Sequence, residues 1–262
     1  MARFKIGIVL ESLGRPLREG LRQASALGAQ GVQVDATGPL APDELSQSGR
    51  KEFRHLLRSL NLELTALGCP LRHGFSVDYG LDARVGHVKK ALSLAYDLGA
   101  RVVTAFPGPL PRDDSPMARE LLVHSLTELD RHGERVGSRL ALEAGLDPPT
   151  EFKDFLNRFT AGGIGVNVDP ASLLGHGHNP ADAVHAFSQL IVHVHARDTR
   201  PHRADRESQE VPIGQGDVDW NAFLGALEAV EYRGWLTVKR GPSANPAGDI
   251  QQGVAFLCRL AG

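Results

Sequence analysis

The most constraining feature of this sequence is a regular alternation of short β-type runs with helix-type segments. The runs are rich in Val, Ile and Leu, and Gly or Pro commonly follows them. The segments between them carry apolar residues three and four positions apart, which gives a helix one apolar face. Strands are predicted at residues 4–10, 31–35, 62–67, 101–106, 139–143, 164–169, within 190–198, and at 234–239.

Helices are predicted between these strands, at residues 16–29, 42–60, 82–98, 116–136, 149–159, 180–187, 220–230 and 248–260. Repeated strand–helix units imply parallel strands joined by right-handed crossovers. Eight such units in 262 residues suit a (β/α)8 barrel. No Gly-x-Gly-x-x-Gly follows the first strand, so a dinucleotide-binding sheet lacks support. We therefore predict an α/β protein with a single TIM-barrel domain over residues 1–262.

The charge and cysteine content exclude several classes of protein. The chain has 29 basic and 31 acidic residues, and this near-balance argues against binding to nucleic acid or to a membrane surface. No apolar run approaches the ~20 residues of a membrane span, and the first residues do not resemble a signal peptide. A cytoplasmic location is therefore expected. Cys69 and Cys258 do not make a disulfide framework, so two buried, reduced thiols are expected.

Four consecutive predicted strands end in an ionisable residue: Glu143, Asp169, His195 and Lys239. In TIM barrels the active site lies at the carboxyl ends of the strands. Residues two apart on a strand share a face, so His193 lies one layer below His195 on the same side. We expect the four strand-end side chains to point together into the mouth of the barrel.

Glu143, Asp169 and His195 are a plausible ligand set for a divalent cation such as Mn²⁺, Mg²⁺, Co²⁺ or Zn²⁺. Charged groups at a barrel mouth need either a metal or oppositely charged partners, because uncompensated burial of charge is costly. The alternative is therefore a structural network of ion pairs at the ends of these strands.

The order and spacing of several segments resemble the xylose isomerase-like TIM barrel superfamily. This superfamily includes sugar phosphate isomerase/epimerase proteins, ketose 3-epimerases, inositol-catabolism enzymes and endonuclease IV. The resemblance covers nearly the whole chain and specifies no substrate. It is strongest at residues 140–143 (LALE), 165–171 (GVNVDPA), 192–198 (VHVHARD) and 211–220 (VPIGQGDVDW), and residues 232–239 (YRGWLTVK) match the last strand in all but the final residue.

The resemblance implies that Glu143, Asp169 and His195 are three of four metal ligands. The fourth ligand in the family is a Glu at the end of strand eight, where this chain has Lys239. In the epimerases that the chain resembles, the glutamates of strands five and eight also move the proton next to a carbonyl. Ser172 is a second departure, because ketose epimerases tend to carry a His there. Both metal binding and two-base epimerisation are thereby put in question.

Four roles for Lys239 are compatible with the sequence. Its ammonium could replace the charge of the metal and stabilise an enolate-like intermediate. It could form a Schiff base, although two nearby carboxylates oppose the deprotonation that this needs. The site could bind a sugar-like ligand without turnover. Finally, Lys239 could turn away and leave three ligands and water to hold a metal.

Further residues are candidates for substrate contact. His73 and His176 follow the third and sixth predicted strands, on the catalytic side. Arg197 and Arg200 come directly after His195 and could bind a phosphate or carboxylate. Between them, Asp198 could orient a neighbouring side chain. Solvated loops and surface ion pairs are the alternatives for these residues.

The sequence predicts a sugar isomerase or epimerase that acts by proton transfer next to a carbonyl on a small polyhydroxy substrate. Glu143 is the predicted base, and Lys239 a catalytic or substrate-contacting group, at an incomplete divalent-metal site. A sugar-binding barrel without catalysis, with or without metal, is the main alternative, and an endonuclease IV-like enzyme a more distant one. The family allows a homo-oligomer.

Overall fold

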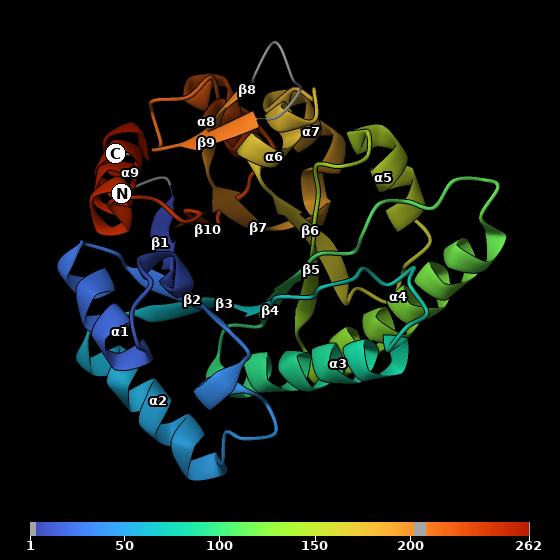
Figure 1. Ribbon diagram of the computed structural model, residues 1–262, viewed down its shortest axis with the longest axis horizontal. Coiled ribbons are helices and arrows are strands. Elements are labelled where there is room, and N and C mark those ends of the chain that lie inside the picture. Colours follow the sequence, from blue (N-terminus) through green and yellow to red (C-terminus); the bar gives the residue numbers. More distant parts are fainter. Residues whose placement is uncertain (1–3, 202–207, 262) are drawn as a thin grey trace.

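The computed structural model describes residues 4–201 and 208–261, and eight of its strands form a closed parallel barrel (Figure 1). Around the barrel the strands follow the order β1-β10-β7-β6-β5-β4-β3-β2, so strands consecutive in the chain lie side by side. The predicted (β/α)8 barrel is therefore confirmed. Its strands are β1 (Lys5–Val9), β2 (Gly31–Asp35), β3 (Glu63–Cys69), β4 (Val102–Ala105), β5 (Arg139–Glu143), β6 (Ile164–Val168), β7 (Ile191–Ala196) and β10 (Trp235–Val238).

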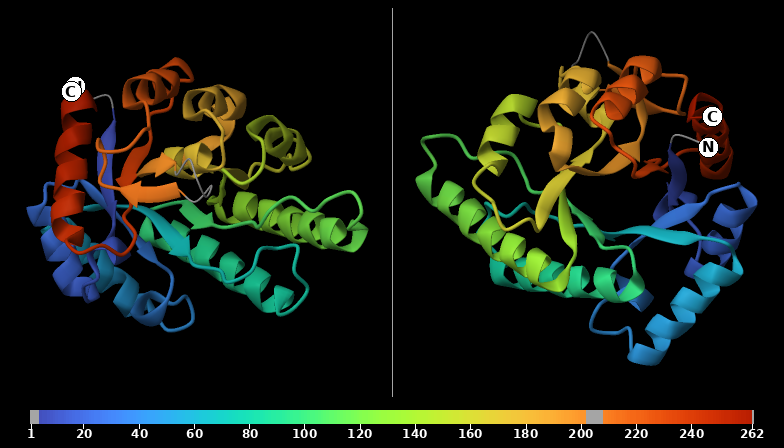
Figure 2. Two further views of the ribbon diagram at one scale, coloured as in Figure 1. Left: turned by 45° about the horizontal axis from the view of Figure 1, so that its top comes forward. Right: turned by 180° about the vertical axis from the view of Figure 1, so that it is seen from behind.

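Helices surround the barrel in all three ribbon views (Figure 2). All the predicted helices are present, except that the first and the fifth end three residues earlier than predicted and the second starts five residues later. That helix begins at residue 47 and not at 42, because the Ser46 side chain accepts a hydrogen bond from Gly49 N and caps it there. The helices are α1 (Leu17–Ala26), α2 (Gln47–Ser59), α3 (Leu81–Leu98), α4 (Pro116–Val136), α5 (Pro149–Leu156), α7 (Pro180–Phe187), α8 (Trp220–Ala229) and α9 (Pro246–Ala261).

The alternation of side chains along each strand separates two interiors. One set of apolar residues, such as Ile6, Val34 and Val194, is buried in the continuous core of the molecule. The other set faces the barrel axis and includes buried polar groups such as Asn167 and His195, which are hydrogen-bonded to each other. The barrel therefore carries its polar chemistry on the axis, where the strand ends can present it.

Several short elements were not predicted. They are the 3₁₀ helices η1 (Leu10–Leu13), η2 (Gly38–Leu40) and η3 (Ser188–Leu190), the short helix α6 (Pro170–Gly175), and an antiparallel hairpin of β8 (Asp198–Pro201) and β9 (Ser208–Val211). Helix α6 forms because Asp169 caps its first turn and Pro170 occupies its first position.

Asp198 anchors the segment that follows β7, which the sequence suggested only as a long loop. Its carboxylate is fully buried and not at the surface, and its partners within residues 4–201 and 208–261 are N–H groups. It accepts hydrogen bonds from the backbone N–H groups of Thr199, Gly214, Gly216 and Val218 and from Trp220 Nε1, at 2.8–3.3 Å. One buried carboxylate thereby fixes the path from the hairpin to α8.

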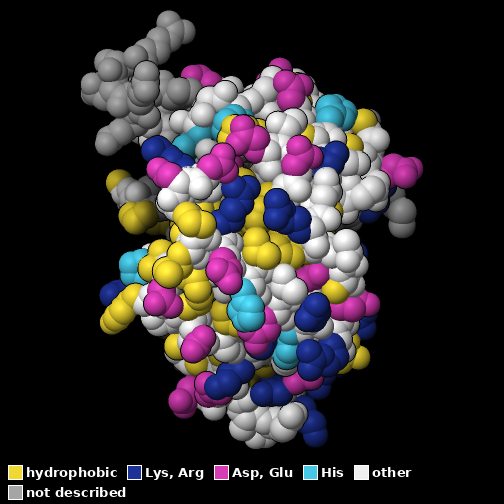
Figure 3. All heavy atoms as spheres, turned by 90° about the vertical axis from the view of Figure 1, so that its right-hand side faces the viewer, with side chains coloured by type: hydrophobic (Ala, Val, Ile, Leu, Met, Phe, Trp, Pro, Cys, Tyr) yellow, Lys and Arg dark blue, Asp and Glu magenta, His cyan; other side chains and the backbone are white. Residues whose placement is uncertain are grey.

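The remaining sequence expectations concern the surface and the cysteines. Basic and acidic side chains are interspersed on the face seen in Figure 3. None of the helices within residues 4–201 and 208–261 combines the length and apolar character needed to cross a bilayer. Both cysteines are free thiols, as predicted; Cys69 is buried as expected, whereas Cys258 is exposed and the expectation that it is buried is wrong.

Candidate active site

A cavity of about 520 Å³ opens at the carboxyl ends of the barrel strands. This is the end at which TIM barrels carry their active sites. The walls come from β1, β2, β3, β4 and β5 and from the segments that follow β1, β3 and β10. The polar groups that line it include Glu11, Gln33, Asp35, Thr104, Glu143 and Lys239.

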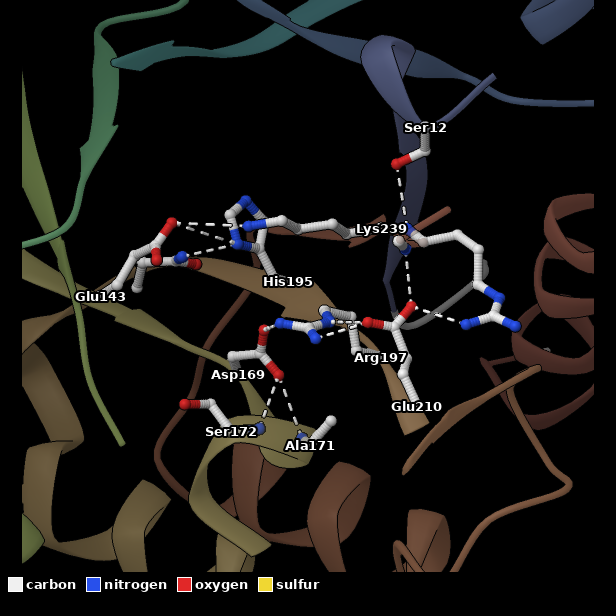
Figure 4. A network of polar contacts seen from close by, with 12 residues as sticks. Ser12, Glu143, Asp169, Ala171, Ser172, His195, Arg197, Glu210 and Lys239 are labelled. Atoms are coloured by element: carbon white, nitrogen blue, oxygen red, sulfur yellow. Dashed lines mark hydrogen bonds and ion pairs between the residues drawn. The ribbon is translucent and has the colours of Figure 1, made fainter. Parts of the chain in front are cut away.

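Glu143 and Lys239 form an ion pair across this cavity. Lys239 Nζ lies 3.6 Å from Glu143 Oε1, and both side chains are about one third exposed, at 32% and 30%. The two side chains reach toward each other from β5 and from the end of β10 (Figure 4). The structure thus brings together the two residues for which the sequence predicted catalytic roles, and it leaves both accessible to a small ligand.

Asp35 adds a second carboxyl group to this cluster. Burial raises the pKa of Asp35, the charge of Lys239 opposes that rise, and the charge of Glu143 adds to it. The side chain of Asp35 occupies space that Gly68 leaves open, since a Cβ at Gly68 would stand 2.1 Å from Asp35 Oδ1. A glycine on β3 therefore allows this carboxyl group to enter the cavity.

His195 is buried beneath the cavity with both ring nitrogens hydrogen-bonded. Asn167 Nδ2 donates to His195 Nδ1 at 2.8 Å, and His195 Nε2 donates to Gln33 Oε1 at 2.9 Å. Burial lowers the pKa of His195 well below its ordinary value, and the charges of Lys239, His193 and Arg197 add to this effect. The imidazole is therefore neutral. Its Nδ1 lies 3.9 Å from Glu143 Oε1, but the two groups do not form an ion pair.

Asp169 is held by a different set of partners. Its Oδ1 accepts the backbone N–H groups of Ala171 and Ser172 at 3.0 Å, and its Oδ2 accepts Arg197 Nη1 at 3.1 Å. Arg197 Nε also donates to Glu210 Oε2 at 3.1 Å. The charge of Asp169, then that of Glu210, holds the pKa of Arg197 above its ordinary value.

Glu210 continues this network on the far side of Arg197 (Figure 4). Its Oε1 accepts Arg240 Nη1 at 3.0 Å and Gly241 N at 2.7 Å. Arg240 also donates Nε to Asp249 at 2.9 Å, so its guanidinium is committed to two carboxylates. The hairpin residue Glu210 therefore ties β7 to the segment after β10.

These side chains do not fit the divalent-metal site that the sequence suggested. Both oxygens of Asp169 and both nitrogens of His195 already have protein partners, and the ammonium of Lys239 stands beside Glu143. Over the described part of the chain, no group of three or more His, Cys, Asp or Glu side chains is arranged to hold a metal ion. The predicted ligand set of Glu143, Asp169 and His195 is therefore not confirmed by this geometry, in which Lys239 pairs with Glu143 and Arg197 pairs with Asp169.

The four residues predicted to contact substrate lie away from the lining of the cavity. His73 is exposed and packs edge-on against Tyr79, beside a separate cavity of about 360 Å³. His176 is exposed, and its Nδ1 lies 2.8 Å from the backbone oxygen of Ser172 in the preceding helix α6. Arg197 is held by Asp169 and Glu210, and exposed Arg200 donates to Gln215 O. Their role in substrate binding remains a prediction.

Glu11 and Asp35 are lining residues that sequence reasoning missed. Each lies at or just after the end of a strand, so the rule that selected Glu143 would have found both if applied to the first two strands. Glu11 Oε1 accepts a hydrogen bond from Asp35 N at 2.8 Å. Although Glu11 as a residue is exposed, partial burial of its carboxyl group and then the charge of Asp35 raise its pKa to about 7.

A family described as xylose isomerase-like TIM barrel matches residues 21–260. The chain belongs to this family. A relative in Bacillus subtilis, the uncharacterized protein YfiH, is 28% identical, with 97% of this chain and 98% of the relative covered. The family resemblance inferred from the sequence motifs is thereby confirmed.

Solved structures show the same fold. A xylose isomerase domain protein from Planctomyces limnophilus has a TM-score of 0.82 and 24% identity, with 92% of this chain and 91% of that chain covered. A D-allulose 3-epimerase from Methylomonas sp. has a TM-score of 0.76 and 19% identity, with 99% and 98% covered. At these identities the likeness concerns the fold of the barrel.

Proposed function

We propose that this protein is a sugar isomerase or epimerase that moves a proton next to a carbonyl group, with Lys239 in the electrostatic role that a metal ion could have filled. The observation that carries the proposal is the ion pair of Glu143 and Lys239, 3.6 Å apart in an open cavity at the carboxyl ends of the strands. A base and a cation within one small cavity are what deprotonation of a carbon next to a carbonyl requires.

The reaction assigns one role to each member of the pair. Glu143 removes the proton from the carbon next to the carbonyl, and the electron pair of that bond moves toward the carbonyl oxygen. The ammonium of Lys239 stabilises the oxyanion that develops there, in a site that is partly shielded from water. His195 Nδ1 lies 3.9 Å from Glu143 Oε1, and the imidazole stays neutral because burial keeps its pKa low.

The cavity favours a small uncharged polyhydroxy compound. Its lining holds the carboxyl groups of Glu11, Asp35 and Glu143 against the ammonium of Lys239, and the guanidinium of Arg240 is bound to Glu210 and Asp249. A phosphate group would meet carboxylates in this lining, whereas hydroxyl groups can donate hydrogen bonds to them. The fold shared with a D-allulose 3-epimerase supports a sugar as the class of substrate.

The proposal is tested by hydrogen exchange in D₂O. The protein is incubated with D-fructose, D-allulose, D-tagatose and D-sorbose, and deuterium at the carbon next to the carbonyl is followed by NMR. We expect exchange in the wild type, a loss of about 100-fold or more in Glu143→Gln, and a loss of about 100-fold in Lys239→Met. Glu52→Gln, an exposed glutamate on α2, serves as the matched control and keeps the wild-type rate.

Binding measurements distinguish the proposed enzyme from the main alternative, a sugar-binding barrel without catalysis. A sugar that binds with equal affinity to the wild type and to Glu143→Gln, with no exchange in either, would identify a binding protein without catalysis. Exchange at the wild-type rate in Glu143→Gln would remove this residue from the reaction.

A further inference from the structure

The wall of the cavity opposite Glu143 carries two carboxyl groups, Glu11 and Asp35, that the reaction above does not use. We propose that Glu11 and Asp35 form a second proton-transfer pair, so that the site inverts a carbon centre by protonation from the face opposite Glu143. This inference rests on the proposed function and makes it more specific, because it selects epimerisation over isomerisation on one face.

The order of the strands places this pair across the barrel from Glu143. In the closed order, β1 is four strands from β5 in both directions, which is the largest separation that eight strands allow. Glu11 lies in η1, directly after β1, and Asp35 ends β2, which is paired with β1. A small ligand in the cavity therefore has Glu143 on one side and this pair on the other.

Local contacts hold both carboxyl groups at this wall. The N–H of Asp35 donates to Glu11 Oε1, and Ser12 Oγ accepts Arg240 N at 2.9 Å, which ties η1 to the segment after Lys239. Gly14 closes η1 with φ +61°, a conformation that favours glycine, and donates its N–H to Glu11 O. The turn that presents Glu11 is therefore built into the barrel mouth.

Asp35 is the member of the pair whose pKa depends on the charges of both reacting groups. The charges of both Lys239 and Glu143 act on Asp35, whereas the charge that acts on Glu11 is that of Asp35. The thiol of Cys69, whose pKa burial raises to about 12, is also beside Asp35 and stays protonated. Glu11 holds the proton of the pair near neutral pH, because burial and then the charge of Asp35 raise its pKa to about 7.

The proton balance of the reaction closes. Glu143 takes a proton from the carbon, and the electrons of the C–H bond form the enolate. The pair then gives its proton to the opposite face of that carbon, and the carbonyl group is restored with inverted configuration. Glu143 is left protonated and the pair is left without its proton, and exchange with water resets both. No oxidant, reductant or further reactant is needed.

The test follows deuterium uptake and inversion separately in the four ketohexoses used above. Asp35→Asn and Glu11→Gln are expected to lose inversion by about 100-fold. Both are expected to keep deuterium exchange into the unreacted sugar, because Glu143 still removes and returns a hydrogen on its own face. Inversion at the wild-type rate in either variant would contradict the assignment of Glu11 and Asp35 as the second proton-transfer pair. Exchange without inversion in the wild type would contradict it too. Absence of any exchange in the wild type instead refutes the proposed function, and the pair with it.

A measurement without substrate tests the same pair. The side-chain carboxyl groups of ¹³C-labelled protein are titrated by NMR, and the Glu11 signal is assigned from its loss in Glu11→Gln. We expect a midpoint near pH 7 that moves to lower pH in Asp35→Asn, because the charge of Asp35 contributes to the raised pKa. A midpoint at the ordinary value of 4.5 would overturn the inference. Circular dichroism of each variant confirms that the barrel is folded.

Discussion

Replacement of Asp198 with alanine is expected to destabilise the protein by about 3 kcal/mol. The carboxylate accepts hydrogen bonds from four backbone N–H groups and one indole N–H, all within 3.3 Å. The residues that contain two of these donors, Gly214 and Gly216, retain solvent contact, so water can replace the carboxylate there. The donors of Thr199, Val218 and Trp220 belong to buried residues and would lose a partner.

The magnitude follows from those three buried donors. Each unsatisfied buried donor costs about 1 kcal/mol or more, which gives about 3 kcal/mol in total. Asp219→Ala is the matched control, because Asp219 is exposed and its side chain caps α8 through one hydrogen bond to Ala222 N. The loss of one such cap costs about 1 kcal/mol.

Urea unfolding followed by circular dichroism measures both variants against the wild type, and hydrogen exchange reports the amides of Gly214 and Gly216. We expect Asp198→Ala to lose about three times the stability that Asp219→Ala loses, with faster exchange at both glycines. A loss no greater than that of Asp219→Ala, with unchanged exchange, would refute the assignment of Asp198 as the anchor of this segment.

Three further predictions concern the cavity. Gly68→Ala places a Cβ 2.1 Å from the Asp35 carboxyl group. It is expected to abolish inversion of the sugar, measured by NMR, and to lower stability by about 1–3 kcal/mol, measured by thermal unfolding. Inversion at the wild-type rate in this variant would contradict the prediction. The folded-state pKa of Glu11 is raised to about 7, so the wild type loses stability as pH rises from 4.5 to 7. The Tm of Glu11→Gln relative to that of the wild type is therefore expected to be higher at pH 8 than at pH 5. An equal difference in Tm at both pH values would refute this. Elemental analysis is expected to find both the purified wild type and Lys239→Glu nearly free of transition metal, because Arg197 remains hydrogen-bonded to Asp169 in both. About one tightly held ion per chain in the wild type would count against this geometry.

The fold was predictable because its signal is local and repeated. Strand runs with helical segments between them specify a barrel without reference to any long-range contact. The β8–β9 hairpin was not predictable in this way, since it is fixed by the buried carboxylate of Asp198 and by amides up to 20 residues away. The spacing of apolar residues along the sequence does not indicate such a long-range hydrogen bond.

The site was predictable to the extent that it depends on strand ends. The rule that strand-end residues meet at the barrel mouth brought Glu143 and Lys239 together correctly. The metal-ligand set stays a prediction, because its rule ignores competing partners, and Arg197 and the start of α6 occupy both oxygens of Asp169. Glu11 and Asp35 were missed because the strand-end rule was applied only to the last four strands, although both lie at or just after the ends of the paired strands β1 and β2.

The central claim is that Glu143 and Lys239 activate a carbon next to a carbonyl without a metal ion. Deuterium uptake into the ketohexoses is therefore measured with protein treated with EDTA, before and after addition of Mn²⁺. The claim predicts uptake that neither treatment changes and that Glu143→Gln abolishes. Uptake that appears only after Mn²⁺ is added would contradict it, and would show that the ion pair seen here opens to admit a metal.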